Sequence, residues 1–170
     1  MTIHSEHPFA DADRDQVRRL RARVGATVSL WTAGTLGADA AGLTVSSYLV
    51  VAGEPGRMVA ALDPDSDLSE RLHSSGRAVV HLLAGDRREL AEMFGGTLPA
   101  PGGAFVHADF ADTPYGPRLT DAVTWAAVSL ESSSDLGWST LVTATIDEVA
   151  VGEQDWLVHR QGRFERLRPE

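Results

Sequence analysis

Two residue types that carry much of enzyme chemistry are missing from this chain, which contains no cysteine and no lysine. Without cysteine there are no disulfides, no thiolate metal ligands and no cysteine nucleophile. Without lysine, a Schiff-base lysine and the lysine of a phosphate-binding P-loop are both excluded. Every basic side chain other than histidine is therefore an arginine.

Long apolar runs and an excess of positive charge are missing as well. No stretch reaches the roughly 18 apolar residues of a membrane span, and polar residues interrupt the first ten positions, so no export signal is readable and we expect a cytoplasmic protein. The net charge of −9 disfavours nucleic acid or an anionic membrane as a partner. The six histidines show no metal-ligand spacing, so we predict no metal site, and no catalytic acid–base residue is identified.

The remaining composition is that of a globular domain. At 170 residues and 43% apolar content, the chain can bury roughly 70% of its unfolded surface. We expect a loose segment over residues 1–10 and a single domain over residues 11–170.

Short apolar or alternating segments, separated by glycine and proline turns, predict a mostly antiparallel sheet with helices packed outside. Segment 132–140 is interpreted as a loop, and 95–103 as a lid or a plain surface loop. The expected strands are 26–32, 41–52, 58–62, 78–83, 105–110, 123–131, 141–151, 156–160 and 163–167. The expected helices run from Asp11 or Asp13 to about Val24, from the 63–67 segment to about Ser74, and over 86–94.

Hydroxyl side chains are concentrated in the stretch Ala41–Ser47. In an extended segment Thr44 and Ser46 point to one face, while Val45 and Ser47 point to the other. The hydroxyl face and the neighbouring amides are suited to a ligand, and the alternative is a strand that ends in a hydroxyl-stabilised turn.

The order of the motifs resembles the flavin reductase-like family of FMN-binding split barrels over most of residues 10–168. Gly42–Tyr48 is similar to the family's G-[LM]-T-V-S-S-[FY], and 86–94 to its D-x-x-x-L-A-x-x-F helix. The ending 156–164 is similar to a hairpin whose last aromatic residue approaches the flavin. The resemblance implies a mostly β (α+β) fold, an antiparallel split β-barrel with three or so peripheral helices.

The resemblance also implies NAD(P)H-dependent reduction of FMN or FAD, with reduced flavin supplied to a monooxygenase. Family members are homodimers with the flavin near the subunit interface, and we expect Trp31 to be an exposed aromatic residue at such an interface. The expected cofactor-binding residues are Thr44, Val45, Ser46, Ser47, Leu62, Asp63, Ser66, Ser69, His81, Phe94 and Phe164, with Trp138 on the nicotinamide side.

Several positions depart from the family pattern and leave alternatives open. Gly137–Ser139 replaces a Gly-Asp-His motif, so a non-catalytic FMN-binding protein or electron carrier is an alternative, as is a barrel for deazaflavin F420 or haem. Ser66 and Ser69 lie at a predicted helix start, whose exposed backbone amides favour an anion. Either these residues bind a phosphate there, or the neighbouring aspartates themselves satisfy the helix start. His81 stands where the family has asparagine, and is either a flavin neighbour or a hydrogen-bonded core residue. The arginines of segment 14–23 are either a phosphate grip or a solvated face.

Overall fold

The computed structural model describes residues 16–168 of the chain. The expected loose segment 1–10 and the helix caps Asp11 and Asp13 lie outside the described residues. Three α-helices are present in the described part, as expected: α1 (Gln16–Arg23), α2 (Asp67–Ser75) and α3 (Arg88–Phe94), together with a 3₁₀ turn, η1 (Ala104–His107).

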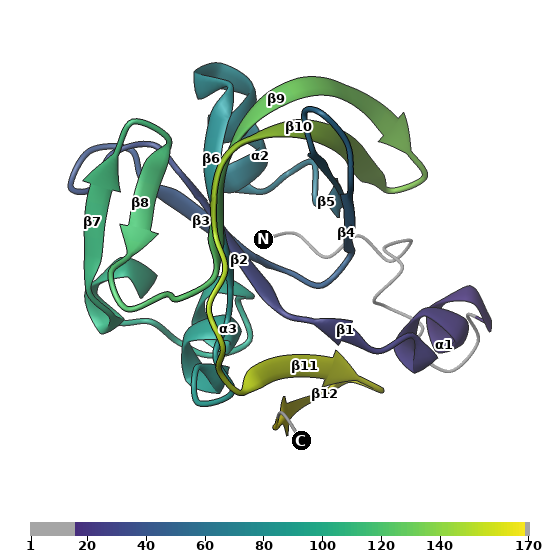
Figure 1. Cartoon of the computed structure of the whole chain (residues 1–170). Coiled ribbons are helices and arrows are strands. Elements are labelled where there is room, and N and C mark those ends of the chain that lie inside the picture. Colours follow the sequence, from purple (N-terminus) through teal and green to yellow (C-terminus); the bar gives the residue numbers. More distant parts are fainter. Residues whose placement is uncertain (1–15, 169–170) are drawn as a thin grey trace.

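A curled, seven-stranded antiparallel sheet forms the centre of the fold (Figure 1). The two strands at its edges, β3 and β4, follow one another in the chain, so the link Ser46–Ser47 ties both edges together at one end. This half-barrel confirms the expected split-barrel class. Its strands, in spatial order, are β3 (Ala41–Val45), β2 (Ser29–Ala33), β6 (Arg77–Leu82), β9 (Trp125–Leu136), β10 (Ser139–Ala150), β5 (Arg57–Leu62) and β4 (Tyr48–Val51).

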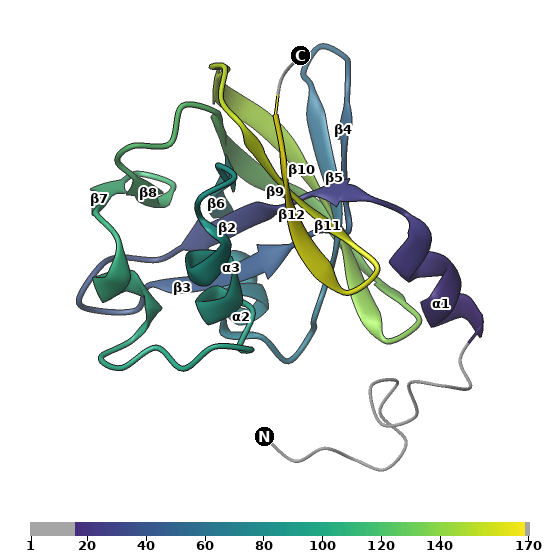
Figure 2. The ribbon, with the colours of Figure 1, turned by 90° about the horizontal axis from the view of Figure 1, so that it is seen from below.

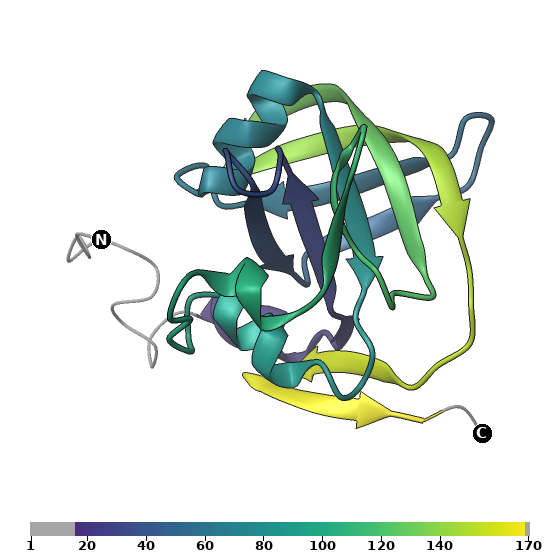
Figure 3. The ribbon, with the colours of Figure 1, turned by 90° about the vertical axis from the view of Figure 1, so that its left-hand side faces the viewer.

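Two smaller sheets lie beside the half-barrel. The first contains β1 (Ala26–Thr27), β11 (Trp156–Arg160) and β12 (Arg163–Leu167), and the second is the hairpin of β7 (Phe110–Thr113) and β8 (Gly116–Leu119). Helix α1 stands beside the turn of the β11–β12 hairpin (Figure 2), where the Gln161 amide donates to the Ala22 carbonyl at 2.6 Å. Helix α2 covers one end of the sheet, and α3 lies near β11 and β12 (Figure 3).

The half-barrel has buried apolar residues on both of its faces. One cluster, which includes Trp31, Val45 and Leu72, fills the space under α2, and the other, which includes Leu30, Phe94 and Leu157, lies under α3 and the β11–β12 hairpin. Strand β2 takes part in both clusters, and all five of its residues are buried. This is the burial expected of a strand covered on both faces.

Three sequence-based boundaries are wrong. The expected strand 41–52 is broken at Ser46 and Ser47, because β3 pairs with β2 whereas β4 pairs with β5. Segment 105–110 is a 3₁₀ turn followed by the start of β7. Segment 132–140 is a strand hairpin, because β9 and β10 pair up to Leu136 and Ser139 around a two-residue turn. Gly137 has the positive φ of 58° that such a turn requires at its first position.

The expectation of an exposed Trp31 is also wrong. Its side chain is 0% exposed, and the indole Nε1 donates to Ser29 Oγ at 3.1 Å. Ser29 Oγ in turn donates to the Val45 carbonyl at 2.7 Å. Trp31 therefore supports the strand β3 from inside and is not available as an interface residue.

Replacing Trp31 with alanine should lower the free energy of unfolding by about 3–5 kcal/mol, because a large buried side chain is lost and a cavity remains. Urea denaturation at neutral pH measures this loss, and Trp31→Phe should give a smaller one. Trp138→Ala is the matched control, since Trp138 is 72% exposed, and it should change stability by less than about 0.5 kcal/mol. Equal losses for the two tryptophans would contradict the burial of Trp31.

Candidate functional site

The link between β3 and β4 has backbone donors that are unpaired within the described residues. Val45 is buried in the core, while Thr44 and Ser46 both line a cavity, so the predicted alternation of side chains is correct. Within residues 16–168, no acceptor is present for the backbone amides of Ser46 and Ser47. These amides are available to a ligand because no neighbouring strand continues past the β3–β4 link.

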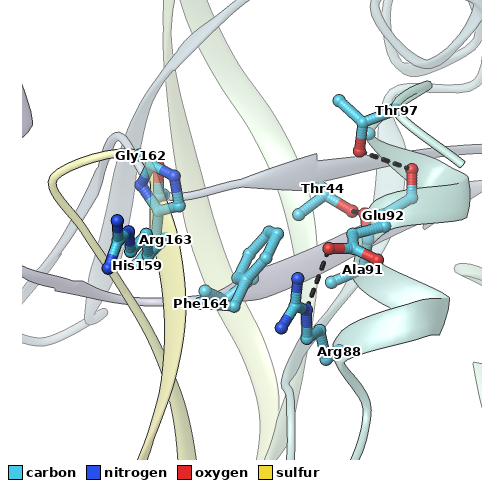
Figure 4. Close-up of a pocket in the computed structure, with 12 residues that line it drawn as sticks. Thr44, Arg88, Ala91, Glu92, Thr97, His159, Gly162, Arg163 and Phe164 are labelled. Carbon is cyan, nitrogen blue, oxygen red and sulfur yellow. Dashed lines mark hydrogen bonds and ion pairs between the residues drawn. The ribbon is translucent and has the colours of Figure 1, made fainter.

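The cavity beside the β3–β4 link has a volume of about 620 Å³, which is in the range of small-molecule and cofactor sites. Its walls come from β3, from α3 with the loop that follows it, and from the β11–β12 hairpin (Figure 4). The lining residues are Val28, Thr44, Ser46, Arg88, Ala91, Glu92, Gly95, Thr97, His159, Gly162, Arg163 and Phe164.

The helical wall of the cavity is held to β3 by a side-chain hydrogen bond. Thr44 Oγ1 donates to the Ala91 carbonyl at 2.7 Å, which uses its proton and leaves its oxygen able to accept. One turn away, Arg88 Nε donates to Glu92 Oε1 at 2.9 Å. Figure 4 shows this ion pair on the α3 side of the cavity. The Phe164 ring lies between the ion pair and the other labelled residues of the β11–β12 hairpin, His159, Gly162 and Arg163.

The hairpin wall is aromatic. The Phe164 ring meets the His159 ring edge-on, with centroids 5.2 Å apart. Burial, and secondly the charge of Arg21, hold the pKa of His159 below its ordinary value. His159 is therefore a neutral aromatic wall at pH 7. Phe164 thus offers an aromatic surface in the same cavity as Thr44 and Ser46.

Phe94 lies behind the site. It is buried and packs edge-on against Phe105, with ring centroids 4.9 Å apart. A Cβ atom on Gly42 would meet Phe94 Cε1 at 2.5 Å. The glycine therefore lets the Phe94 ring lie directly against β3, and Phe94 supports the strand without lining the cavity.

Ser66 and Ser69 are committed to the start of α2. Ser66 Oγ accepts from the Ser69 amide at 3.2 Å, and both hydroxyls donate to the Asp63 carbonyl, at 2.8 and 2.6 Å. Ser69 is also buried. Asp63 Oδ1 accepts from the Asp65 amide at 2.9 Å. The chain thus satisfies this helix start with its own groups, which favours the second of the two sequence interpretations.

The strand register shows that the start of α2 and the β3–β4 link lie at the same end of the sheet. The Ala61 amide donates to the Ser47 carbonyl at 2.9 Å, and Leu62 is the β-partner of Thr140. The β3–β4 link, the end of β5 and the start of β10 therefore lie at one end of the sheet. Ser47, Leu62 and Asp63 lie near this end of the sheet. Trp138 lies at the same end, in the turn between β9 and β10, and it is exposed and does not line the cavity. Leu62 itself is buried, and Ser47 Oγ accepts from Arg21 Nη2 at 2.9 Å.

His81 does not reach the cavity. It is 0% exposed, its Nδ1 lies 2.9 Å from the Leu30 carbonyl, and its Nε2 accepts from the Leu119 amide at 3.0 Å. Because a carbonyl only accepts, Nδ1 carries the proton and the ring is neutral. Burial, and to a lesser degree the charge of Arg118, lower the pKa of His81 to about 4, against the raising effect of the hydrogen bond to Leu30. This environment favours the second sequence interpretation, a hydrogen-bonded core residue, in which His81 ties β6 to β2 and β8.

Sequence reasoning missed the charged residues of the cavity. Helix 86–94 is predicted only as a core helix, so Arg88 and Glu92 on its outer face are not identified. Arg163 is 75 positions away from Arg88. Its one local signal is that it follows Gly162, a turn glycine with φ 75°, and nothing in the sequence pairs it with α3.

Comparison with known proteins identifies the family. The chain belongs to the flavin reductase like domain family, whose sequence model matches residues 21–168. This confirms the resemblance inferred from the motifs. No curated protein sequence matches the chain.

Solved flavin reductases share the fold at low sequence identity. The flavin reductase PheA2 is 21% identical, with a TM-score of 0.81 over 92% of this chain and 99% of that one. The NADH:FAD oxidoreductase SgcE6 of Streptomyces globisporus, in complex with NAD and FAD fragments, is 20% identical, with a TM-score of 0.81 over 94% and 96%. The styrene monooxygenase flavin reductase of Pseudomonas putida S12 is 20% identical, with a TM-score of 0.79 over 92% and 99%.

The neutral state of His81 predicts a component of acid sensitivity. Unfolded histidine binds a proton near pH 6.5, and folded His81 does so only near pH 4. The unfolded state therefore holds more protons in this window, and the free energy of unfolding should fall by about 3 kcal/mol from this residue as pH drops from 7 to 4. His81→Gln keeps a donor and an acceptor but does not titrate, so urea melts at both pH values should show a smaller loss. Parallel pH profiles for the two proteins would refute the assignment.

Proposed function

We propose that this chain is an NAD(P)H-dependent flavin reductase that transfers a hydride from a nicotinamide to FMN or FAD. Its family membership supports the class of reaction. No acid–base group is required for this reaction, which agrees with a cavity whose histidine is neutral and whose glutamate is ion-paired. The cofactors supply the chemistry, in which a hydride leaves nicotinamide C4 and binds at flavin N5.

The observation that carries the proposal is the pair of amides at Ser46 and Ser47, which have no acceptor in the part of the chain that the structure describes and lie beside a cofactor-sized cavity. Negative charge accumulates on the pyrimidine edge of a flavin during reduction, and fixed backbone donors stabilise such charge without having to reorganise. The Thr44 oxygen and the Ser46 hydroxyl add polar groups on the same face. Phe164 offers an apolar surface for the rings.

A homodimer is the proposed assembly. Strand β4 is an edge of the large sheet, yet Leu49 and Val50 on it are 64% and 63% exposed. An uncovered apolar edge strand promotes association, and a second copy would cover it.

We further propose a cytoplasmic location and delivery of reduced flavin to a monooxygenase, since similar proteins include the reductase components of styrene monooxygenase and of a tryptophan halogenase. No helix among residues 16–168 is long and apolar enough to cross a membrane.

A non-catalytic flavin carrier is the second candidate. The turn between β9 and β10 reads Gly137-Trp138-Ser139, so no histidine is available there to receive the nicotinamide. An exposed indole can stack on a ring but cannot replace the hydrogen bonds of an imidazole. A carrier would bind flavin at the same β3–β4 link and would not oxidise NADH or NADPH.

Steady-state turnover separates the two candidates. Purified protein should oxidise NADH or NADPH when FMN or FAD is added, and the released chromophore identifies any flavin, F420 or haem already bound. Phe164→Ala should weaken flavin binding about tenfold through loss of stacking. Leu167→Ala, on the same strand but outside the cavity lining, should leave flavin binding unchanged. Flavin binding with no turnover from either donor would exclude the reductase and leave the carrier.

The role of Trp138 is tested by measuring the KM for the nicotinamide donor and the affinity for flavin separately. Trp138→Ala should raise the KM for the nicotinamide donor about tenfold through lost ring stacking, with a smaller change in flavin affinity. Leu136→Ala is the matched control, because Leu136 is exposed on the other side of the same turn. Unchanged donor kinetics for Trp138→Ala would remove this residue from the site.

A further inference from the structure

Two hollows near the proposed site differ in charge. The cavity at the β3–β4 link is lined by Arg88 and Arg163 against a single carboxylate, Glu92. The groove along α2 is lined by Asp65 and Glu70 and by no arginine; its residues are Pro64, Asp65, Ser66, Ser69, Glu70, His73 and Ser74. In a chain with a net charge of −9, the first hollow is the one suited to an anion.

The groove along α2 is also short of free donors. The hydroxyls of Ser66 and Ser69 both donate to the Asp63 carbonyl, and the Ser69 amide donates to Ser66 Oγ. Asp65 and Asp67 are exposed at the same helix start. A phosphate placed there would meet carboxylates and would have to break hydrogen bonds that the helix already makes.

The cavity offers positioned and unused guanidinium donors. Glu92 contacts Arg88 through Nε alone, at 2.9 Å. Within the part of the chain that the structure describes, no partner is present for the two terminal nitrogens of Arg88 or for the guanidinium of Arg163. The backbone that carries Arg163 is fixed, because the preceding turn is bonded to α1 through the Gln161 amide. Arg88 and Arg163 lie on opposite walls of the cavity, with the Phe164 ring between them (Figure 4). Either guanidinium can donate charge-assisted hydrogen bonds to a phosphate on its own side of the ring.

We propose that this cavity binds the phosphomonoester of a nucleotide cofactor through one of its two arginines, the guanidinium of Arg163 or the terminal nitrogens of Arg88, in place of a phosphate site at the start of α2. The identity of the rest of the ligand rests on the proposed function. Two cofactors of a flavin reductase carry such a group, FMN at its 5′ position and NADPH at its 2′ position. Phe164 and the β3–β4 link lie in the same cavity, so ring and phosphate would occupy neighbouring parts of one site.

Matched ligand pairs test the proposal, since each pair differs by one phosphomonoester. Dissociation constants are measured by calorimetry for FMN against riboflavin and for NADPH against NADH. In the wild-type protein we expect the phosphorylated member of one pair to bind at least about tenfold more tightly. Either Arg163→Ala or Arg88→Ala should reduce that preference about tenfold or more, which identifies the arginine that holds the phosphate. Arg163→Lys or Arg88→Lys at that position should restore part of it.

Two further variants complete the experiment. Arg160→Ala is the control, because Arg160 is the strand partner of Arg163, pairs with Glu165 at 3.2 Å and is outside the cavity lining. It should leave both ratios unchanged. Ser66→Ala tests the start of α2 and should also leave them unchanged.

The outcomes distinguish the source of the phosphate. A reduced FMN-to-riboflavin ratio assigns the subsite to the flavin, and a reduced NADPH-to-NADH ratio assigns it to the donor. Ratios unchanged in Arg163→Ala and Arg88→Ala, or reduced only in Ser66→Ala, overturn the proposal. In that case reductase turnover in the wild-type protein would show that the proposed function still holds, whereas absence of both turnover and nucleotide binding would remove both.

Discussion

The structure depends on a seven-stranded sheet whose two edge strands are consecutive in the chain. Strand β3 ends at Val45 and β4 begins at Tyr48, so two residues connect opposite edges of the curled sheet. At this link the ladder is interrupted, and the amides of Ser46 and Ser47 have no acceptor within residues 16–168. The same feature that ties the barrel together therefore leaves unpaired donors at its surface, where a ligand can satisfy them.

Packing from both sides fixes the position of these donors. From inside, Trp31 bonds Ser29, and Ser29 bonds the Val45 carbonyl. From outside, Thr44 bonds the Ala91 carbonyl of α3. Phe94 packs against the bare backbone of Gly42. A site held in this way requires little reorganisation when a cofactor binds, which is the property that electrostatic stabilisation of a developing charge needs.

Much of the fold could be predicted from the sequence, because alternation and turn residues are local signals. Strands β11 and β12 have the predicted bounds, and the two faces of residues 44–46 are correct. The errors concern information that is not local. Nothing in the order of residues shows that β2 is covered on both faces, which buries Trp31, or that β8 brings an amide to His81. The arginines of the cavity were missed for the same reason, since only the folded chain brings α3 and the β11–β12 hairpin together.

The central claim is that the amides of Ser46 and Ser47 receive the flavin ring. Titration of ¹⁵N-labelled protein with riboflavin, followed by amide chemical shifts, tests it directly because riboflavin has the ring without a phosphate. The account predicts that the Ser46 and Ser47 resonances move the most, together with those of Thr44 and Phe164. Saturable shifts confined to other parts of the chain, with Ser46 and Ser47 unmoved, would contradict it.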